Sequence, residues 1–158
     1  MDTEPFDLAQ ADAYPTVTQI SVFLVERVGE LLRLTRTLDP SDVRIVGLSI
    51  VNAVDTAIAR MIVDDPDGAA QTLRDAGFAI SESELLVVSL PHGKRALLET
   101  WSALLSGEVS VSYTYSLLTQ PKGRPALAVM ADNIPMAAAN LSRRNFTLLD
   151  QSDLAGGY

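Results

Sequence analysis

Apolar and polar residues alternate with different periods along the first half of the chain, and each change of period marks the expected end of an element. Ile20, Val22 and Leu24 alternate with positions of mixed character, which is typical of a strand with one buried face. Between residues 31 and 38 the leucines recur every three or four positions, which predicts a helix. The pattern predicts strands at 19–25, 43–51, 56–63 and 78–80 and helices at 31–38 and 69–76.

The second of these helices has clear start and stop signals. Asp65 precedes Pro66, so an acidic side chain can cap the helix while proline takes its first position. Gly77 follows the last apolar residue, where a left-handed residue commonly ends a helix. Asp64, Asp65 and Asp67 do not have the spacing of a calcium loop, so helix capping explains them better than a metal site does.

The same order of elements, βαββαβ, then recurs. Four landmarks keep nearly constant spacing. Leu31 lies 66 residues before Leu97, and Val43 lies 66 before Val109. Gly77-Phe78 lies 68 residues before Asn145-Phe146, and Ser83-Glu84-Leu85 lies 69 before Ser152-Asp153-Leu154. A repeat that keeps its register in this way indicates two related units. The second is predicted to hold strands at 85–90, 109–115, 126–130 and 146–149 and helices at 97–105 and 135–141.

A βαββαβ unit of this size predicts a ferredoxin-like sandwich, in which a four-stranded antiparallel sheet carries both helices on one face. The expected fold class is therefore α+β, with two tandem ferredoxin-like βαββαβ sandwiches. Residues 1–17 are expected to form a flexible N-terminal segment, residues 18–82 the first unit and residues 83–158 the second. Ser81–Glu84 is predicted to be a polar linker between the units.

The predicted strands carry more apolar surface than one isolated unit can bury. Residues 85–88 and 126–130 are apolar at successive positions, so both faces of these strands require cover. Residues 110–116 are rich in β-branched and aromatic side chains and carry no charge, so a free edge there favours strand pairing. The two units are expected to pack against each other, and the chain is expected to form a homodimer.

Composition and charge exclude several classes of function. Of the 158 residues, 20 are acidic and 12 basic, and the net charge of −8 disfavours binding to nucleic acid or anionic membranes. With no cysteine and one histidine, His92, the chain lacks ligands for thiolate or histidine metal sites, and no metal or cofactor is expected. The acidic N-terminus lacks the features of a signal peptide, and no apolar run approaches a membrane span. A cytoplasmic location is therefore expected.

The segment ISVFLVERVGELLRLTRTLDPSDVRIVGLSI resembles the opening of an ACT domain, in which the first strand runs into an Arg-Pro-Gly-Glu-Leu-like loop, a helix and a second strand. The loop positions that match are Arg27, Gly29, Glu30 and Leu31. Val28 stands where the family prefers proline, and Arg44 where it often has asparagine. The resemblance continues through VDDPDGAAQTLRDAGFAI and covers residues 18–154, although LPHGKRALL of the second repeat keeps only the glycine and the leucines. It implies a stand-alone tandem ACT protein that binds a small molecule, usually an amino acid, at interfaces between ACT domains.

The chemistry of this loop also fits a carboxylate ligand. Gly29 permits close backbone approach, and the first N–H groups of the following helix can receive an anion. Arg27 could add a charge-assisted hydrogen bond, while Glu30 or Asp42 could accept from an ammonium group. The candidate ligand-binding residues of this first site are Arg27, Val28, Gly29, Glu30, Leu31, Asp42, Val43 and Arg44. A structural interpretation remains open, in which Gly29 only makes a tight strand-to-helix turn and Arg27 is solvated. Arg44 could bind an acidic side chain or a ligand carboxylate, or it could instead fill and close the site.

A second candidate is the basic cluster His92, Gly93 and Lys94 at the start of a helix, which suits an anion. The alternative is a solvated surface loop, and the glycine and lysine lack the remaining residues of a phosphate loop. Tyr113 and Tyr115 lie two apart on one strand face and could stack on a ligand, although such pairs more often belong to a core or interface. The spacing of Trp101 from neighbouring leucines predicts a core position.

Two regulatory functions and one enzymatic function follow from these features. The first is a regulatory module that binds an amino acid. The second is a ligand-independent regulatory subunit or interaction partner of an amino-acid biosynthetic enzyme, an arrangement that resembles acetohydroxyacid synthase small subunits in outline. Catalysis has weak support, because the chain has no cysteine, no Ser-His-Asp order and no acid that can be assigned to its one histidine. No catalytic residues are predicted.

Overall fold

The computed structural model describes residues 14–25 and 27–155. The elements are β1 Val17–Leu24, α1 Arg27–Leu38, β2 Ile45–Asn52, β3 Ala57–Val63, α2 Pro66–Asp75, β4 Ala79–Ser89, α3 Ala96–Leu105, β5 Val111–Ser116, the 3-10 turn η2 Pro121–Gly123, β6 Ala126–Ala131, α4 Ile134–Arg143, β7 Thr147–Leu149 and α5 Gln151–Ala155. Each predicted helix and strand overlaps one of these elements. The first 13 residues of the expected flexible segment lie outside the described residues, and Val17 already belongs to the sheet.

Strand β4 is shared by the two halves of the molecule. Its first part, as far as Leu85, pairs antiparallel with β1, whereas its last part, from Leu86 onward, pairs with β6 and β7. The 7-stranded sheet has the order β2-β3-β1-β4-β6-β5, with β7 beside β4. The prediction of a linker at Ser81–Glu84 is therefore wrong, because all four residues pair with β1. Ser81, Glu82 and Glu84 are exposed and Ser83 is half-buried, so the strand can carry polar side chains here.

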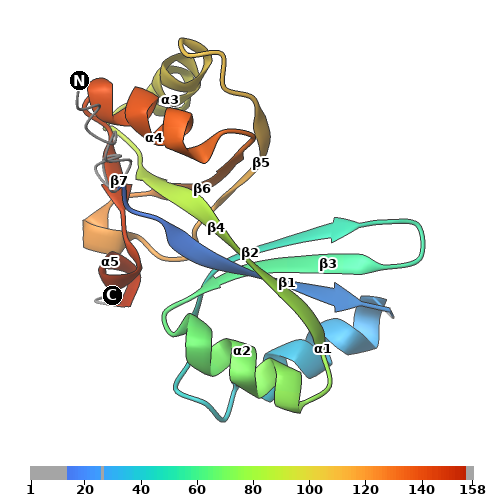
Figure 1. The fold of residues 1–158 in the computed structure, drawn as a ribbon. Coiled ribbons are helices and arrows are strands. Elements are labelled where there is room, and N and C mark those ends of the chain that lie inside the picture. Colours follow the sequence, from blue (N-terminus) through green and yellow to red (C-terminus); the bar gives the residue numbers. More distant parts are fainter. Residues whose placement is uncertain (1–13, 26, 156–158) are drawn as a thin grey trace, which may run out of the picture.

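The sheet is curled, and helices cover its two outer sides (Figure 1). α1 and α2 pack on the first half, α3 and α4 on the second, and each pair encloses its own apolar core. A third core lies between the halves, on the helix-free face of the sheet. Alternate residues of β4 explain this layering, since Leu86 and Val88 face the α3–α4 core while Leu85 and Val87 face the third core. The expectation that the two halves pack against each other is confirmed.

The outer strands β2 and β5 also meet at one point. Gly47 forms a bridge with Leu117, and the Leu118 N–H donates to the Val46 carbonyl at 2.8 Å. A Cβ atom on Gly47 would lie 2.9 Å from the Leu117 side chain, so this approach requires glycine or a shift of the leucine. One end of the β5 edge is thus covered by β2.

The predicted helix signals of α2 are confirmed, and those of α4 are similar. Asp65 accepts a hydrogen bond from the Gly68 N–H at 3.1 Å, and Asn133 accepts one from the Met136 N–H at 3.1 Å. The residues after the two helices, Gly77 and Asn145, both have positive φ, of 86° and 63°. No helix within 14–25 and 27–155 is long and apolar enough to cross a bilayer.

The fourth landmark of the repeat does not hold in the structure. Ser83-Glu84-Leu85 belongs to β4, whereas Ser152-Asp153-Leu154 belongs to α5. α5 was not predicted, because five residues are too few to display a helical period. Leu154 is nevertheless buried in the third core, so the short helix closes one side of the contact between the halves.

Candidate functional site

The first predicted loop lies inside a helix rather than before it. α1 begins at Arg27, so Val28, Gly29 and Glu30 occupy its first turn. The N–H groups of a first turn have no partner within the helix, and a Cβ on Gly29 would meet nothing within 4 Å. A ligand can therefore reach this backbone. The side chain of Arg27 lies outside the part of the chain that the structure describes.

Two other residues of this turn have structural partners. Glu30 forms an ion pair with Arg33 at 2.9 Å. The Arg33 guanidinium also donates to the Ala76 carbonyl at 2.7 Å and lies 4.0 Å from the centre of the Phe78 ring. Leu31 packs against the first core. Glu30 is thus held against the surface between α1 and α2.

Asp42, Val43 and Arg44 lie at the other end of α1. The helix has 12 residues and is therefore about 18 Å long. Asp42 is exposed, Val43 packs against the first core, and the Arg44 N–H donates to the Asp64 carboxylate at 2.7 Å. The structure does not bring these residues together with the first turn of α1 within one chain.

His92, Gly93 and Lys94 are exposed and precede α3, as predicted. Gly93 has a φ of 102°, and its carbonyl accepts a hydrogen bond from the Ala96 N–H at 3.3 Å. α3 lies in the upper layer of Figure 1 and α1 in the lower one. The two predicted loops therefore lie on opposite sides of the folded molecule.

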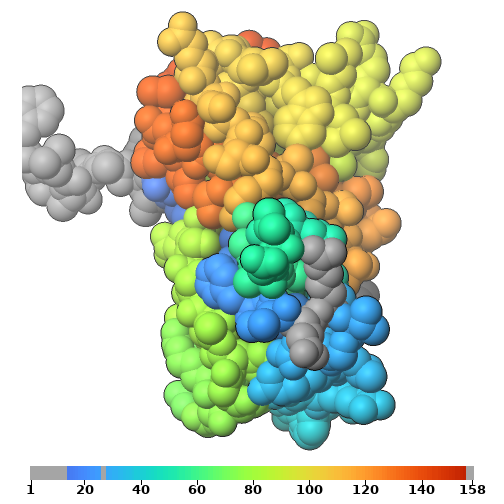
Figure 2. Space-filling model, turned by 90° about the vertical axis from the view of Figure 1, so that its right-hand side faces the viewer, coloured from blue at the N-terminus to red at the C-terminus, as the bar shows by residue number. Residues whose placement is uncertain are grey.

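Apolar side chains are exposed on α1, at the end of β1 and on the β2–β3 hairpin. We name this group the hairpin patch, and it consists of Phe23, Val25, Val28, Leu32, Val51 and Val54. Phe23 and Val51 flank Ile58 on β3 in direct register. Figure 2 shows the tip of the β2–β3 hairpin (teal) beside the end of β1 (blue) on one face of the molecule. The patch is unusual because Val28 is 87% exposed and Val54 91%.

The side chains of the two tyrosines on β5, Tyr113 and Tyr115, contact other residues of the chain. The Tyr115 hydroxyl donates to Gln19 Oε1 at 2.7 Å, and Gln19 Nε2 donates to the Tyr113 hydroxyl at 2.7 Å. Arg60 stacks over the Tyr113 ring at 3.8 Å. Burial raises the pKa of Tyr115 well above its ordinary value. Both rings belong to the contact between the halves, which agrees with the prediction that such a pair belongs to a core or interface.

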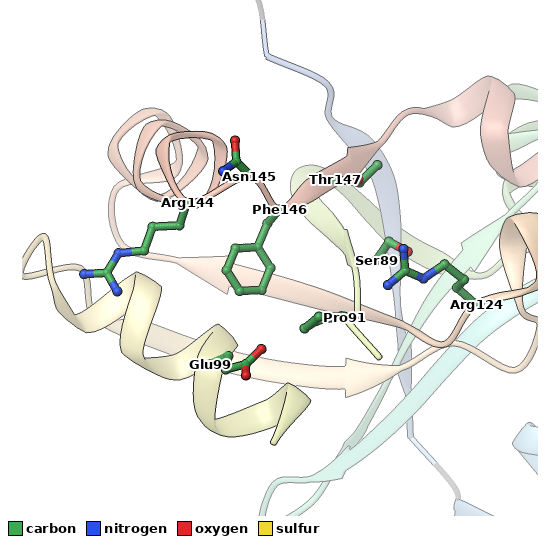
Figure 3. A pocket seen from close by; sticks show the side chains of 8 residues that line it. All are labelled: Ser89, Pro91, Glu99, Arg124, Arg144, Asn145, Phe146 and Thr147. Carbon is green, nitrogen blue, oxygen red and sulfur yellow. The ribbon is translucent and has the colours of Figure 1, made fainter. Parts of the chain in front are cut away.

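A cavity of about 140 Å³ lies in the second half, and sequence reasoning missed it. It is lined by Ser89, Pro91, Glu99, Arg124, Arg144, Asn145, Phe146 and Thr147 (Figure 3). None of the predicted ligand-binding residues lines it, although Pro91 immediately precedes the predicted His92 cluster. A second, apolar cavity of about 250 Å³ lies between α3 and β5. Trp101 lines that cavity and is half-buried, so its predicted core position is only partly correct.

Residues 15–156 match the protein family described as the ACT domain pair. Among solved structures, a Bacteroides thetaiotaomicron protein is similar with a TM-score of 0.82 and 27% identity, over 91% of this chain and 99% of that one. The regulatory subunits of aspartate kinase from Thermus thermophilus and Thermus flavus are similar with TM-scores of 0.56 and 0.53 and identities of 12% and 9%. In both cases 83% of this chain and 93% of the other are covered, and at these identities the likeness shows the fold alone.

No curated protein sequence matches the chain. The family match nevertheless extends from just before β1 to the end of α5. The α+β architecture, with a curled antiparallel sheet and paired helices, agrees with it. The chain belongs to the ACT domain pair family.

Proposed function

We propose that this protein is a non-catalytic regulator that binds an amino acid at an interface between ACT units. Its two units are ferredoxin-like, comprise residues 18–82 and 83–158, and share β4. The strand orders β2-β3-β1-β4 and β5-β6-β4-β7 support two such units, and the pairing of β4 with β1 as far as Leu85 favours a boundary three residues later. Binding would alter the assembly through different affinities of the ligand for two states.

The observation that carries the proposal is the first turn of α1, where nothing lies within 4 Å of a Cβ on Gly29 and Val28 is 87% exposed. A ligand carboxylate could accept from the N–H groups near Gly29, which have no partner within the helix, and the exposed side chains of Val28 and Leu32 on α1 favour cover by another protein surface. No predicted ligand residue belongs to the core between the two halves. The interface that completes this site therefore belongs to a homodimer, in which each copy presents the same patch.

Replacing Gly29 by valine should weaken amino-acid binding at least tenfold, because the side chain occupies the approach to the first turn. The fold should survive, with a change of less than about 1 kcal/mol in unfolding free energy, since valine is no worse than glycine in a helix. Calorimetry with an amino acid that raises the melting temperature in a screen of all twenty measures the effect. Ser102→Val, at an exposed position of α3, is the matched control, and equal affinity in both variants contradicts the site.

Light scattering at low concentration should give the mass of a dimer of 17.0 kDa chains. Val28→Glu should shift it to the monomer, because it places a charge in the apolar interface. Leu98→Glu is the control, since Leu98 is also exposed on a helix but lies in the second half. A wild-type monomer contradicts the proposed interface.

The second candidate function is a ligand-independent regulatory subunit of an amino-acid biosynthetic enzyme. The Glu30–Arg33 ion pair favours it, because it removes an acceptor that a ligand ammonium would use. The similar Thermus proteins are regulatory subunits of aspartate kinase, and such a role is consistent with this function. An amino-acid screen without any stabilisation would favour this second function.

A further inference from the structure

The cavity between α3 and β5 has walls that are almost entirely apolar. Its volume is about 250 Å³, and it is lined by Trp101, Leu104, Leu105, Val109, Ser110 and Val111. Among the described residues, none that lines this cavity carries a charge. A charged group inside it would lose water without gaining a partner. The cavity therefore favours an uncharged ligand.

The first half of the molecule shows that folding does not require an apolar side chain at two of these positions. At the 66-residue spacing of the repeat, Thr35 and Asp39 correspond to Trp101 and Leu105. Thr35 and Asp39 are exposed, so the first βαββαβ unit folds with hydrophilic residues at both places. In the second half, Trp101 is half-buried and Leu105 is 70% exposed.

Two other lining residues belong to the core. Leu104 and its equivalent Leu38 are 1% and 2% exposed. Val109 and its equivalent Val43 each pack against the core of their own half. Core packing therefore accounts for these residues, but not for the tryptophan or for the second leucine. Single exposed apolar residues are common, whereas two that the core does not use and that line one cavity indicate a binding site.

The size of the cavity fits a small aromatic molecule. An apolar cavity of about 150 Å³ in another protein holds one benzene ring, so the larger volume here has room for about two fused rings. The indole of Trp101 gives such rings a flat wall for stacking. Leu97 and Leu98 are also exposed on α3 but do not line the cavity. The site is thus confined to the end of α3 and the start of β5, which favours a small molecule over a long segment of a partner protein.

We propose that this cavity binds a small, uncharged aromatic molecule of one or two rings, which stacks on Trp101 and contacts Leu105 and Val111. Burial of apolar surface drives the binding. The ligand differs from an amino acid because it carries no formal charge. The cavity lies in the second half, whereas the proposed amino-acid site lies at the first turn of α1, so this inference does not rest on the proposed function.

The test uses indole as the probe and the full-length chain labelled with ¹⁵N. The chain has one tryptophan, so the side-chain N–H of Trp101 gives a single NMR signal that reports on this cavity. Indole should shift that signal in a saturable way. Indole-3-acetate has the same rings and one carboxylate, and it should bind at least tenfold more weakly. Equal affinity for the two compounds would overturn the inference that the ligand is uncharged.

Leu105→Asp introduces the residue that the first half has at the equivalent position. It should weaken indole binding at least tenfold, because it places a charge in the apolar wall. Leu105 is 70% exposed, so the variant should fold, and its melting temperature checks this. Leu98→Asp is the matched control, since it makes the same change at an exposed leucine of α3 outside the cavity. Equal weakening in both variants would overturn the placement of the ligand.

Two further outcomes separate this inference from the rest of the molecule. Gly29→Val should leave indole binding unchanged, and a tenfold loss in that variant would place indole at the interface site instead. A wild-type chain that does not bind indole overturns the inference but leaves the proposed amino-acid site untouched. If indole does not bind and Leu105→Asp lowers the mass measured by light scattering, a second copy of the chain covers this cavity, and the small-molecule site is wrong.

Discussion

Replacing Leu85 by alanine should lower the free energy of unfolding by about 3–5 kcal/mol, the usual cost of removing a fully buried leucine side chain. Leu85 is 0% exposed and lies in the core between the two halves. It is also the last residue of β4 that pairs with β1, immediately before the part that pairs with β6. A cavity at this point therefore weakens both halves together.

Chemical denaturation followed by far-UV circular dichroism and by the fluorescence of Trp101 measures this effect. Trp101 reports on the second half and circular dichroism on the whole chain, so the two curves should coincide in the wild type and in Leu85→Ala. Glu84→Ala is the matched control, since this neighbour is exposed and its loss should change stability by less than about 0.5 kcal/mol. Separate transitions by the two probes would contradict the coupling through β4.

The elements that could be predicted are those whose own residues determine them. The alternation of β1, the leucine spacing of α1 and the caps at Asp65 and Gly77 are local signals, and the structure reproduces them. The sequence wrongly predicts a linker at Ser81–Glu84, within β4, because these four residues are polar and glutamate is depleted in strands. The reason they are tolerated is the partner strand β1, which lies about 60 residues earlier and leaves no mark on the local sequence.

The candidate site likewise has features that the sequence predicts and features that depend on tertiary contacts. The repeat spacing places Arg33 and Glu99 at equivalent positions, but the sequence gives no sign that Arg33 covers Phe78. Without that contact, an arginine in one half and a glutamate in the other look like two solvated residues. The cavity beside Phe146 depends on Arg124, which the sequence marks only as part of a turn rich in proline and glycine. Its position against Leu90 is a tertiary contact.

Gln19 lies on the face of β1 opposite Ile20, Val22 and Leu24, which the alternation predicts to be the less buried face, yet the second half of the molecule covers it. It is 1% exposed, and its side chain amide bonds both Tyr113 and Tyr115 across the contact between the halves, with a longer bond of 3.3 Å to Ser83. Replacing Gln19 by leucine leaves two tyrosine hydroxyls without this partner. The expected loss is about 2–4 kcal/mol of unfolding free energy, because the penalty for an unsatisfied buried group is about 1–3 kcal/mol.

A compensating variant distinguishes this polar contact from simple packing. Replacing Gln19 by leucine together with Tyr113→Phe and Tyr115→Phe removes all three polar groups, so most of the lost stability should return. Ser21→Ala, at a buried position two residues further along β1, is the control for a change on the same strand. A triple variant as unstable as Gln19→Leu would mean that the shape of the glutamine, and not its hydrogen bonds, joins the halves. Recovery would instead assign this amide the role of fixing how the two ACT units meet, since an apolar contact alone allows other registers.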